Sequence, residues 1–203
     1  MLEEDRGYSV LLVSASEQMN ASLLALLAGE RYSPVLTVSS VSAAKRAAAE
    51  REYDFLLVNS PLPDDPGVRF AVDRSASGGG VVLFLVRAEL FAETDEKLGG
   101  CGVFVLSKPT SRTAMQTALS WMRSARERLR KSEKKSLSLE EKMGEIRLIN
   151  RAKWTLIRTR GMDEAAAHRW IEKTAMDRSV TRREIALEIL GGETAGNEEE
   201  RTI

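Results

Sequence analysis

The chain has 203 residues, of which 30 are basic and 30 are acidic, and its formal net charge is zero. This length is enough for one full domain and a second, smaller one. No apolar run is long enough to span a membrane, and the N-terminus lacks a signal-peptide pattern. We therefore expect a cytoplasmic protein with no membrane partner.

Cysteine and histidine are too scarce for the commonest catalytic and metal sites. Cys101 is the only cysteine and His168 the only histidine, so an intrachain disulfide is excluded. The two residues lie in segments that we assign to different domains, and no metal-ligand spacing occurs. We expect no enzymatic activity, no metal and no cofactor.

The zero net charge hides an uneven distribution along the chain. The net charge is −4 over residues 1–120, +4 over 121–144, +3 over 145–190 and −3 over 191–203. An acidic front and a basic back indicate that any polyanion binds the back. Solvated helix faces would give the same balance, so charge alone leaves both interpretations open.

Strand-like and helix-like segments alternate in the first 120 residues. Short apolar runs typical of buried strands occupy residues 8–13, 35–38, 55–58, 80–86 and 103–106. Helical spacing occurs at 20–28 and 41–50, with weaker signals at 68–74 and 90–97. This alternation predicts an α/β fold in which a parallel sheet carries helices on both faces, with the flavodoxin-like strand order.

Local motifs in this region resemble the receiver domain of two-component response regulators. The matches are Tyr53-Asp54 before the third strand, Leu62-Pro63 followed by Gly67 after it, and Lys108-Pro109 after the fifth strand. The resemblance covers roughly residues 7–122. It implies a (βα)5 domain that would normally accept a phosphoryl group.

The residues that such a domain uses for phosphorylation are mostly replaced here. The phosphoacceptor position holds Asn59, the magnesium-binding pair is Ser14-Ala15, and the position after the fourth strand holds Val86, so that only Lys108 remains. An amide does not form an acyl phosphate, and neither Ser14 nor Ala15 offers a carboxylate to a hard cation. We expect a degenerate receiver that is not phosphorylated at the usual position.

Neighbouring acidic residues offer an alternative, in which they replace the missing carboxylates and restore phosphorylation. Glu17, Asp64 and Asp65 lie near the same end of the predicted sheet, on loops beyond the strands. They would have to reach the pocket to replace its carboxylates. With no phosphate to bind, Lys108 would instead bond carbonyl groups at the sheet edge or pair with Asp64 or Asp65.

A long segment without helix breakers follows the receiver-like region. Residues 111–145 contain no proline, and their first glycine is Gly144. We predict one long helix whose apolar stripe forms a coiled coil in a homodimer. The stripe comprises Met115, Leu119, Met122, Leu129, Leu139 and Met143 and is interrupted by the polar run 130–136. The alternative is a flexible, solvated linker.

The basic stretch that begins at residue 145 is typical of three short helices. The first break contains Gly161, which suits a left-handed helix end, and is followed by Asp163 as an N-cap. After the second break, Thr181 and Glu184 have the spacing of a capping box. Helices this short need to pack on one another or on a partner to be stable.

This stretch resembles the ANTAR domain, the RNA-binding module of bacterial transcription antiterminators. The matching residues are Arg151-Ala152-Lys153, Leu156-Ile157, Gly161-Met162, Glu164, Ala167, Ile171, Ala175-Met176-Asp177 and Ala186. The family often has glycine after the Ala-Lys pair, where this chain has Trp154. The resulting organisation is a degenerate receiver domain (1–122), a coiled-coil linker helix (123–144), an ANTAR module (145–190) and a disordered acidic tail (191–203).

Basic side chains in and near these helices are the candidates for RNA contact. They are Arg151, Lys153, Arg158, Arg160, Arg178, Arg182 and Arg183. The resemblance implies Arg151 and Lys153, whereas the others follow from charge and position. Trp154 and Trp170 are candidates for stacking on bases, although we expect Trp170 to belong to the core.

The resemblance implies an antitermination regulator that binds paired RNA hairpins in a nascent leader transcript. Binding would prevent a terminator hairpin from forming, and the receiver would serve for dimerisation or for docking a regulatory protein. Two alternatives stay open at this point. One is a DNA-binding response regulator in which the basic helices act as a helix-turn-helix, and the other is a protein-interaction scaffold without nucleic acid.

Overall fold

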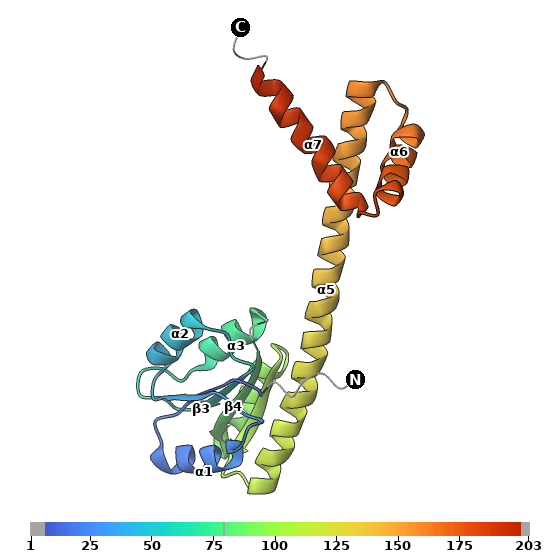
Figure 1. Cartoon of the computed structure of the whole chain (residues 1–203). Coiled ribbons are helices and arrows are strands. Elements are labelled where there is room, and N and C mark those ends of the chain that lie inside the picture. The colour runs from blue at the N-terminus through green and yellow to red at the C-terminus, as the bar shows by residue number, and fades with distance from the viewer. Residues whose placement is uncertain (1–6, 79, 200–203) are drawn as a thin grey trace. The chain divides into compact units, whose positions relative to one another are not determined.

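The chain forms two compact units joined through one helix. A computed structural model describes residues 7–78 and 80–199. The units are Met1–Arg130 and Lys131–Ile203. Helix α5 (Arg112–Arg160) begins in the first unit and ends in the second, as the single long helix predicted from the sequence (Figure 1).

The first unit is built on a five-stranded parallel sheet. Its strands are β1 (Val10–Val13), β2 (Val35–Val38), β3 (Phe55–Asn59), β4 (Val81–Arg87) and β5 (Val103–Lys108). They pair in the order β2-β1-β3-β4-β5, with Val10 of β1 opposite both Val35 and Phe55. The predicted fold class, a flavodoxin-like (βα)5 domain, is confirmed.

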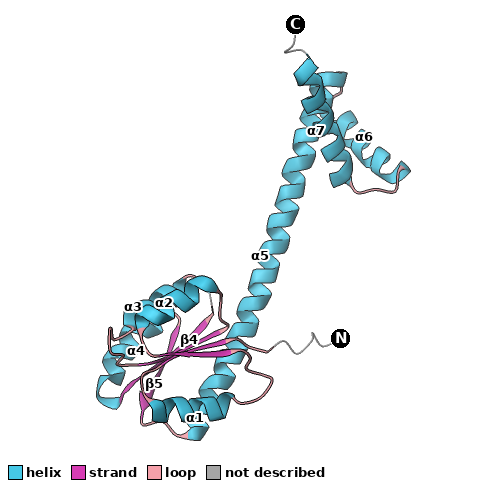
Figure 2. Ribbon diagram, turned by 60° about the vertical axis from the view of Figure 1, so that its left-hand side comes forward, coloured by secondary structure: helices cyan, strands magenta, loops and turns pink. Residues whose placement is uncertain are grey.

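Helices cover both faces of this sheet (Figure 2). The covering elements are α1 (Glu17–Leu27), α2 (Val41–Glu50), α3 (Val68–Ala76), α4 (Phe91–Gly99) and the start of α5, while the exposed 3₁₀ turn η1 (Ala88–Leu90) joins β4 to α4. Side chains of α2, α3 and α4 share one core with the sheet, whereas those of α1 and α5 share the other. The central strands are therefore buried on both sides, which explains their continuous apolar sequences.

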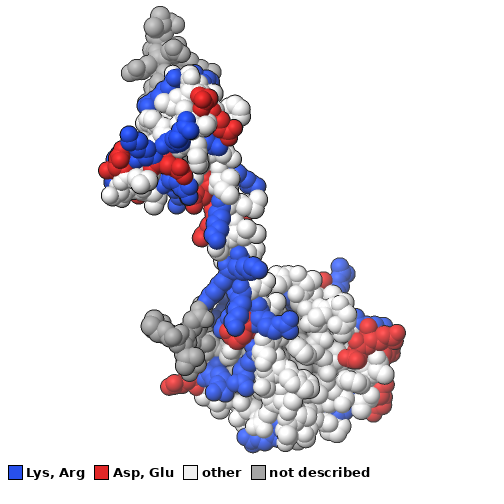
Figure 3. Space-filling view, turned by 90° about the vertical axis from the view of Figure 1, so that its right-hand side faces the viewer, with Lys and Arg blue, Asp and Glu red and all other residues white. Residues whose placement is uncertain are grey.

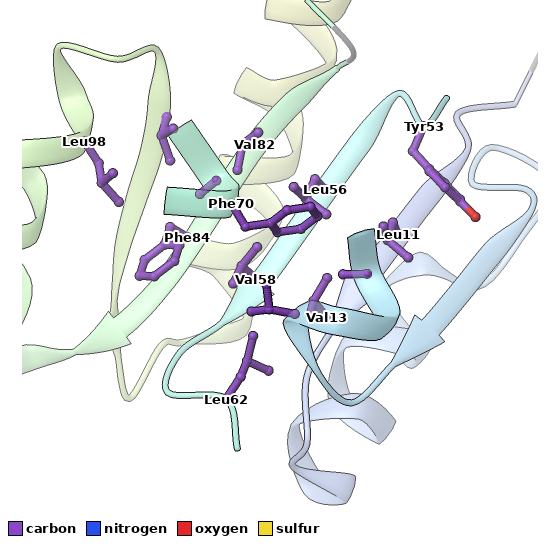
Figure 4. Packing of buried hydrophobic residues seen from close by; sticks show 14 of the residues in the cluster. Leu11, Val13, Tyr53, Leu56, Val58, Leu62, Phe70, Val82, Phe84 and Leu98 are labelled. Atoms are coloured by element: carbon purple, nitrogen blue, oxygen red, sulfur yellow. The ribbon is translucent and has the colours of Figure 1, made fainter. Parts of the chain in front are cut away.

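The core on the α3 side shows how closely the helices pack on the sheet. Figure 4 shows Phe70 of α3 lying against Leu56, Val58 and Val82 of the strands. Phe70 is 4% exposed. Burying a side chain of this size contributes about 1.5–3 kcal/mol.

The start of α5 belongs to the other core, and this corrects part of the predicted dimer stripe. Met115, Leu119 and Met122 are 3%, 3% and 0% exposed and pack against the sheet. These three residues are therefore not available for a second chain. Helical spacing reveals that one face of a helix is covered, but it does not distinguish the protein's own sheet from a partner.

Two arginines hold the next turns of α5 to the first unit. Arg126 Nε and Arg130 Nη2 each donate to Asp54 Oδ1 at 2.8 Å, and Ser9 N donates to Asp54 Oδ2 at 3.0 Å. The Asp54 side chain is only 12% exposed. The Arg130 guanidinium also lies over the Tyr8 ring, 4.9 Å from its centroid. We call this group, Tyr8, Ser9, Asp54, Arg126 and Arg130, the arginine clasp.

The second unit consists of the end of α5 with α6 (Glu164–Asp177) and α7 (Arg182–Glu199). Its core contains Ala152, Leu156, Ala167, Ile171, Ala175, Ile185 and Ala186. All of these except Ile185 were among the residues that carry the ANTAR resemblance. Small alanines at the contacts let the helix backbones approach closely.

The predicted breaks between these helices are confirmed at the level of single hydrogen bonds. Gly161 has φ 62°, and Asp163 Oδ1 accepts from Ala166 N at 2.6 Å. Thr181 N donates to Glu184 Oε2 at 2.7 Å, while Glu184 N donates to Thr181 Oγ1 at 3.2 Å. Both bonds of the capping box are therefore formed.

The C-terminal end differs from the prediction. We expected a disordered tail from residue 191, but α7 continues to Glu199. Gly191 does not have the positive φ that Gly161 uses to end α5, and no proline follows it, so nothing local stops the helix. Residues 200–203, the rest of the predicted tail, lie outside the described residues.

Candidate nucleic-acid interface

At the ends of β1, β3 and β5, the side chains in the phosphorylation positions are hydrogen-bonded to one another. Lys108 Nζ donates to Asn59 Oδ1 at 2.6 Å and also to the carbonyl oxygen of Ser60. Asn59 Nδ2 donates to Ser14 Oγ at 2.9 Å. Asn59 and Ser14 are 5% and 1% exposed, so the amide bridges a lysine and a hydroxyl inside the protein.

Of the two arrangements expected for Lys108, bonding to carbonyl groups or pairing with Asp64 or Asp65, the structure has the first, with the Asn59 amide as a further partner. The lysine bonds an amide and a backbone carbonyl, and its pKa is lowered by burial and then by the nearby charge of Arg87. Val86, the fourth replaced position, is 4% exposed within β4. Ala15 lies exposed after β1. The pocket thus brings together Ser14, Asn59 and Lys108 but places no carboxylate among them.

Two of the three acidic residues considered as replacements for the missing carboxylates, Asp64 and Asp65, are engaged elsewhere. Asp64 accepts from the backbone N–H groups of Ser42 and Val41 at 2.9 Å each, and these bonds lower the pKa of Asp64 to about 2. Asp65 Oδ1 accepts from Gly67 N at 2.6 Å. Within residues 7–78 and 80–199, no cluster of acidic, histidine or cysteine side chains is suited to hold a metal ion.

In the second unit, three of the seven predicted RNA-binding residues are paired with carboxylates. Lys153 Nζ lies 2.9 Å from Glu164 Oε1 across the α5–α6 junction, and only 14% of the lysine side chain is exposed. This bond lowers the pKa of Glu164. Lys153 therefore stabilises the contact between two helices, and its charge is already partly compensated.

The other two paired residues join α6 to α7. Arg178 binds both carboxylate oxygens of Glu188, at 2.5 and 2.8 Å. Arg182 Nη1 lies 3.3 Å from Glu172 Oε1. These arginines are about half exposed, so each keeps part of its guanidinium available to solvent.

A fourth predicted residue, Arg160, stacks on an aromatic ring. Its guanidinium carbon lies 4.6 Å from the centroid of Trp170, which packs against the core of this unit. The prediction that Trp170 belongs to the core agrees with this position. A guanidinium held on a tryptophan face is stabilised by the ring quadrupole and is oriented by it.

The remaining three predicted residues, Arg151, Arg158 and Arg183, are exposed. Arg151 and Arg158 lie on α5 together with the exposed Arg147, which the sequence reasoning missed. The spacing of four residues between Arg147 and Arg151 would have revealed it. Figure 3 shows basic side chains over this unit with acidic ones among them.

Trp154 lies in the same part of α5 and is 71% exposed. Its neighbours Ala152, Thr155 and Leu156 are 0%, 8% and 2% exposed. Because these residues fix which side of the helix faces the core, Trp154 is directed to solvent. The residue that departs from the usual family pattern is thus a surface feature.

An apolar strip remains uncovered in the middle of α5. Of the predicted dimer residues, Leu129, Leu139 and Met143 are 39%, 59% and 46% exposed. Ile146, at 57%, continues the strip and was not among the predicted contacts. Leu139, Met143 and Ile146 follow one another at spacings of four and three residues, as in a coiled-coil seam.

The described helices include none whose length and hydrophobicity would let it cross a membrane.

The first unit is similar to solved receiver structures. A signal receiver domain of an HD domain-containing protein from Pseudomonas fluorescens Pf-5 aligns with a TM-score of 0.54 and 22% identity, over 64% of this chain and 93% of that one. A structure described as an adenylate cyclase from Rhodopirellula baltica aligns with a TM-score of 0.57 and 19% identity, over 65% and 98% of the two chains. The inactive form of the regulatory domain of the repressor of iron transport regulator (RitR) aligns with a TM-score of 0.51 and 24% identity, over 59% of this chain and 97% of that one.

These likenesses define the class: the first unit has the fold of a response-regulator receiver domain. The second unit can be identified more narrowly, since residues 137–190 match the family model of the ANTAR domain. The chain therefore combines a receiver fold with an ANTAR domain. No curated protein matches the chain in sequence.

Proposed function

We propose that the protein is a transcription antitermination regulator that binds hairpins in leader RNA through its ANTAR domain. The observation that carries the proposal is the ANTAR match over a folded three-helix unit that presents exposed arginines on α5. Arginine binds phosphate groups without reading sequence and is suited to the backbone of a structured RNA. Binding would favour the hairpins over a competing terminator and let the polymerase continue.

In this proposal the receiver unit is a regulatory platform that does not use phosphorylation at the usual position, in a cytoplasmic protein. The amide of Asn59 is not a phosphoryl acceptor, and Lys108 already bonds it. Magnesium normally neutralises the developing charge of phosphoryl transfer, and the pocket offers it no carboxylate. A regulatory protein would instead recognise the surface of this unit.

We further propose that the protein acts as a homodimer through the uncovered strip Leu139, Met143 and Ile146. Their heptad spacing continues for only two turns after the polar residues 130–136, so the seam is short. A second copy would bring two ANTAR domains to one transcript. The second hairpin contact would then be intramolecular, which raises the overall affinity without new contacts.

The test of RNA binding compares nucleic acids with the full chain. We expect an RNA with two adjacent stem-loops to bind more tightly than the duplex DNA of the same sequence, and to increase terminator read-through in a purified transcription reaction. Preference for the duplex DNA would instead favour a DNA-binding regulator. Absence of affinity for either, even at low salt, would favour a protein-interaction scaffold.

The test of the receiver uses intact-protein mass spectrometry. Acetyl phosphate with magnesium should add no phosphoryl group to the wild-type chain. Asn59→Asp alone should also stay unmodified, because Ser14 and Ala15 still provide no magnesium ligand. A phosphoryl adduct on an aspartate of the wild-type protein would show that Asp64 or Asp65 replaces the usual site.

A further inference from the structure

An exposed tryptophan lies in a row of arginines on the first ANTAR helix. Arg147, Arg151, Trp154 and Arg158 follow one another at spacings of four, three and four residues, so they share one face of α5. All four are exposed, and Trp154 is the most conspicuous at 71%. We call this set the tryptophan row.

The exposure of Trp154 is imposed by the packing of the helix. Ala152, Thr155 and Leu156, on either side of it in sequence, are buried against α6 and α7 or within α5 itself. Turning α5 to bury Trp154 would bring these residues out of the core. The fold therefore keeps a large, rigid aromatic ring in water, where it can stack on another flat, apolar group.

Trp170 provides an internal comparison. It packs against the core of the same unit, and the Arg160 guanidinium covers one face of its ring at 4.6 Å. Trp154 has no such place in the core. Its nearest residues along the row are arginines, whose positive charges would repel a second copy of the same row in a symmetric dimer. The row is complementary to a polyanion that also carries flat, apolar groups.

We propose that Trp154 is a stacking platform for an unpaired base of the RNA, with Arg147 and Arg151, which precede it along the row, binding neighbouring phosphates. This inference rests on the proposed RNA-binding function and adds the chemical group that is recognised. Bases in a hairpin loop can turn outward and stack on an aromatic side chain, whereas bases in a continuous duplex cannot. The row would thus make the ANTAR domain prefer looped over fully paired RNA.

The experiment uses the full chain and two RNA probes at one salt concentration. The first is a pool of RNAs with two adjacent stem-loops whose stems are fixed and whose loops are randomised. The second is a continuous duplex made of the same stems. Trp154→Ala should weaken binding to the stem-loop pool on the order of 5- to 100-fold and leave duplex binding nearly unchanged.

Three variants separate stacking from charge and from folding. Trp154→Phe keeps an aromatic face and should retain most of the affinity for the stem-loops. Trp121→Ala is the matched control, because Trp121 is also on α5 and 59% exposed but belongs to the first unit, and it should bind like the wild type. Replacing Arg147 and Arg151 together should weaken binding to both probes and reduce its salt dependence.

The outcomes distinguish this inference from the function on which it rests. If the wild-type protein binds neither probe, the proposed RNA-binding function fails and the stacking role fails with it. If the wild type binds the stem-loops but Trp154→Ala binds them equally well, only the stacking role is overturned. It is also overturned if Trp154→Ala loses both probes alike, or if sedimentation shows that the variant has lost self-association, since Trp154 would then belong to the dimer seam.

Discussion

Two stretches of helix α5 have similar apolar spacing, but the apolar side chains of one are buried and those of the other are exposed. In the first, Met115, Leu119 and Met122 are almost fully buried against the sheet of the receiver unit. In the second, Leu139, Met143 and Ile146 are about half exposed. The comparison shows that a repeating apolar stripe identifies a contact face but not its partner, which has to be found from the rest of the fold.

The boundary between the two stretches is marked by the arginine clasp. Arg130 is the last residue of α5 with a described contact to the sheet side of the receiver unit, and it binds Asp54 together with Arg126. Beyond them, residues 131–144 are exposed throughout. The clasp thus extends the attachment of α5 past the apolar core by means of charge.

The largest expected effect is on the free energy of unfolding, which should fall for a substitution in the buried stretch of α5 but not for one in the exposed stretch. Leu119→Ala should lower the free energy of unfolding of the receiver unit by about 2–5 kcal/mol, because it leaves a cavity beside the sheet. Leu139→Ala should change it by less than about 0.5 kcal/mol. Urea unfolding followed by circular dichroism measures both. Equal destabilisation by the two variants would show that the second stretch is covered within the folded chain.

The clasp itself should contribute a smaller amount. Asp54→Asn removes the charge that two partly buried guanidinium groups share and should cost about 2–3 kcal/mol. Asp73→Asn is the control, since Asp73 is 64% exposed and lies 4.0 Å from Arg69. A matching loss in the control would mean that general surface charge, not the clasp, is responsible.

The clasp also predicts a pH dependence. Burial alone would raise the pKa of Asp54, but hydrogen bonds from Arg126, Ser9 and Arg130 outweigh it and lower the pKa below its usual value. The contribution is therefore complete above the unfolded-state pKa, about 3.9, and is lost as the pH falls through the folded-state pKa. The stability difference between wild type and Asp54→Asn should shrink below about pH 4. A difference that stays constant down to pH 2 would contradict this assignment.

The exposed stretch should control self-association and little else. Leu139→Glu places a charge from each chain in the proposed seam and should raise the dimer dissociation constant by roughly 10- to 100-fold, because both copies lose part of the burial of one apolar side chain. Sedimentation velocity over a range of concentrations measures it. Leu137→Glu is the matched control, because Leu137 is 60% exposed but lies off the heptad positions of the strip. If both variants associate like the wild type, the homodimer does not use this strip.

Much of the fold was accessible from the sequence because each signal was local. The alternation of strands and helices, the helix end at Gly161 and the capping box at Thr181 depend on neighbouring residues only, and all three are confirmed. What the sequence could not supply was the partner of each side chain. Leu119 proved to face the sheet, and Lys153 a carboxylate on the next helix.

The candidate site was only partly predictable for the same reason. The replacement of the phosphoacceptor by Asn59 could be read directly, but its bonds to Ser14 and Lys108 depend on three strand ends that meet in space. Arg147 was missed although its spacing from Arg151 was visible. Charge alone could not rank the seven basic candidates, because it does not reveal which of them are already neutralised by acidic neighbours.

The smallest expected effect is a change in the salt dependence of RNA binding, which would distinguish two of the basic candidates, Arg151 and Lys153. Arg151 is exposed, whereas Lys153 is paired with Glu164 and its side chain is 14% exposed. If Arg151 binds a phosphate, Arg151→Ala should lower the slope of log affinity against log salt by about 0.7–0.9.

Lys153→Ala should leave the slope almost unchanged, since an ion pair within the protein releases few counterions from the RNA. Its effect should instead appear as a slight weakening of the contact between α5 and α6. Titrations of a stem-loop RNA at several salt concentrations, with thermal unfolding of each variant, measure both quantities. A slope that falls for Lys153→Ala and not for Arg151→Ala would mean that RNA binding opens the Lys153–Glu164 pair and that the family motif, not exposure, identifies the phosphate contact.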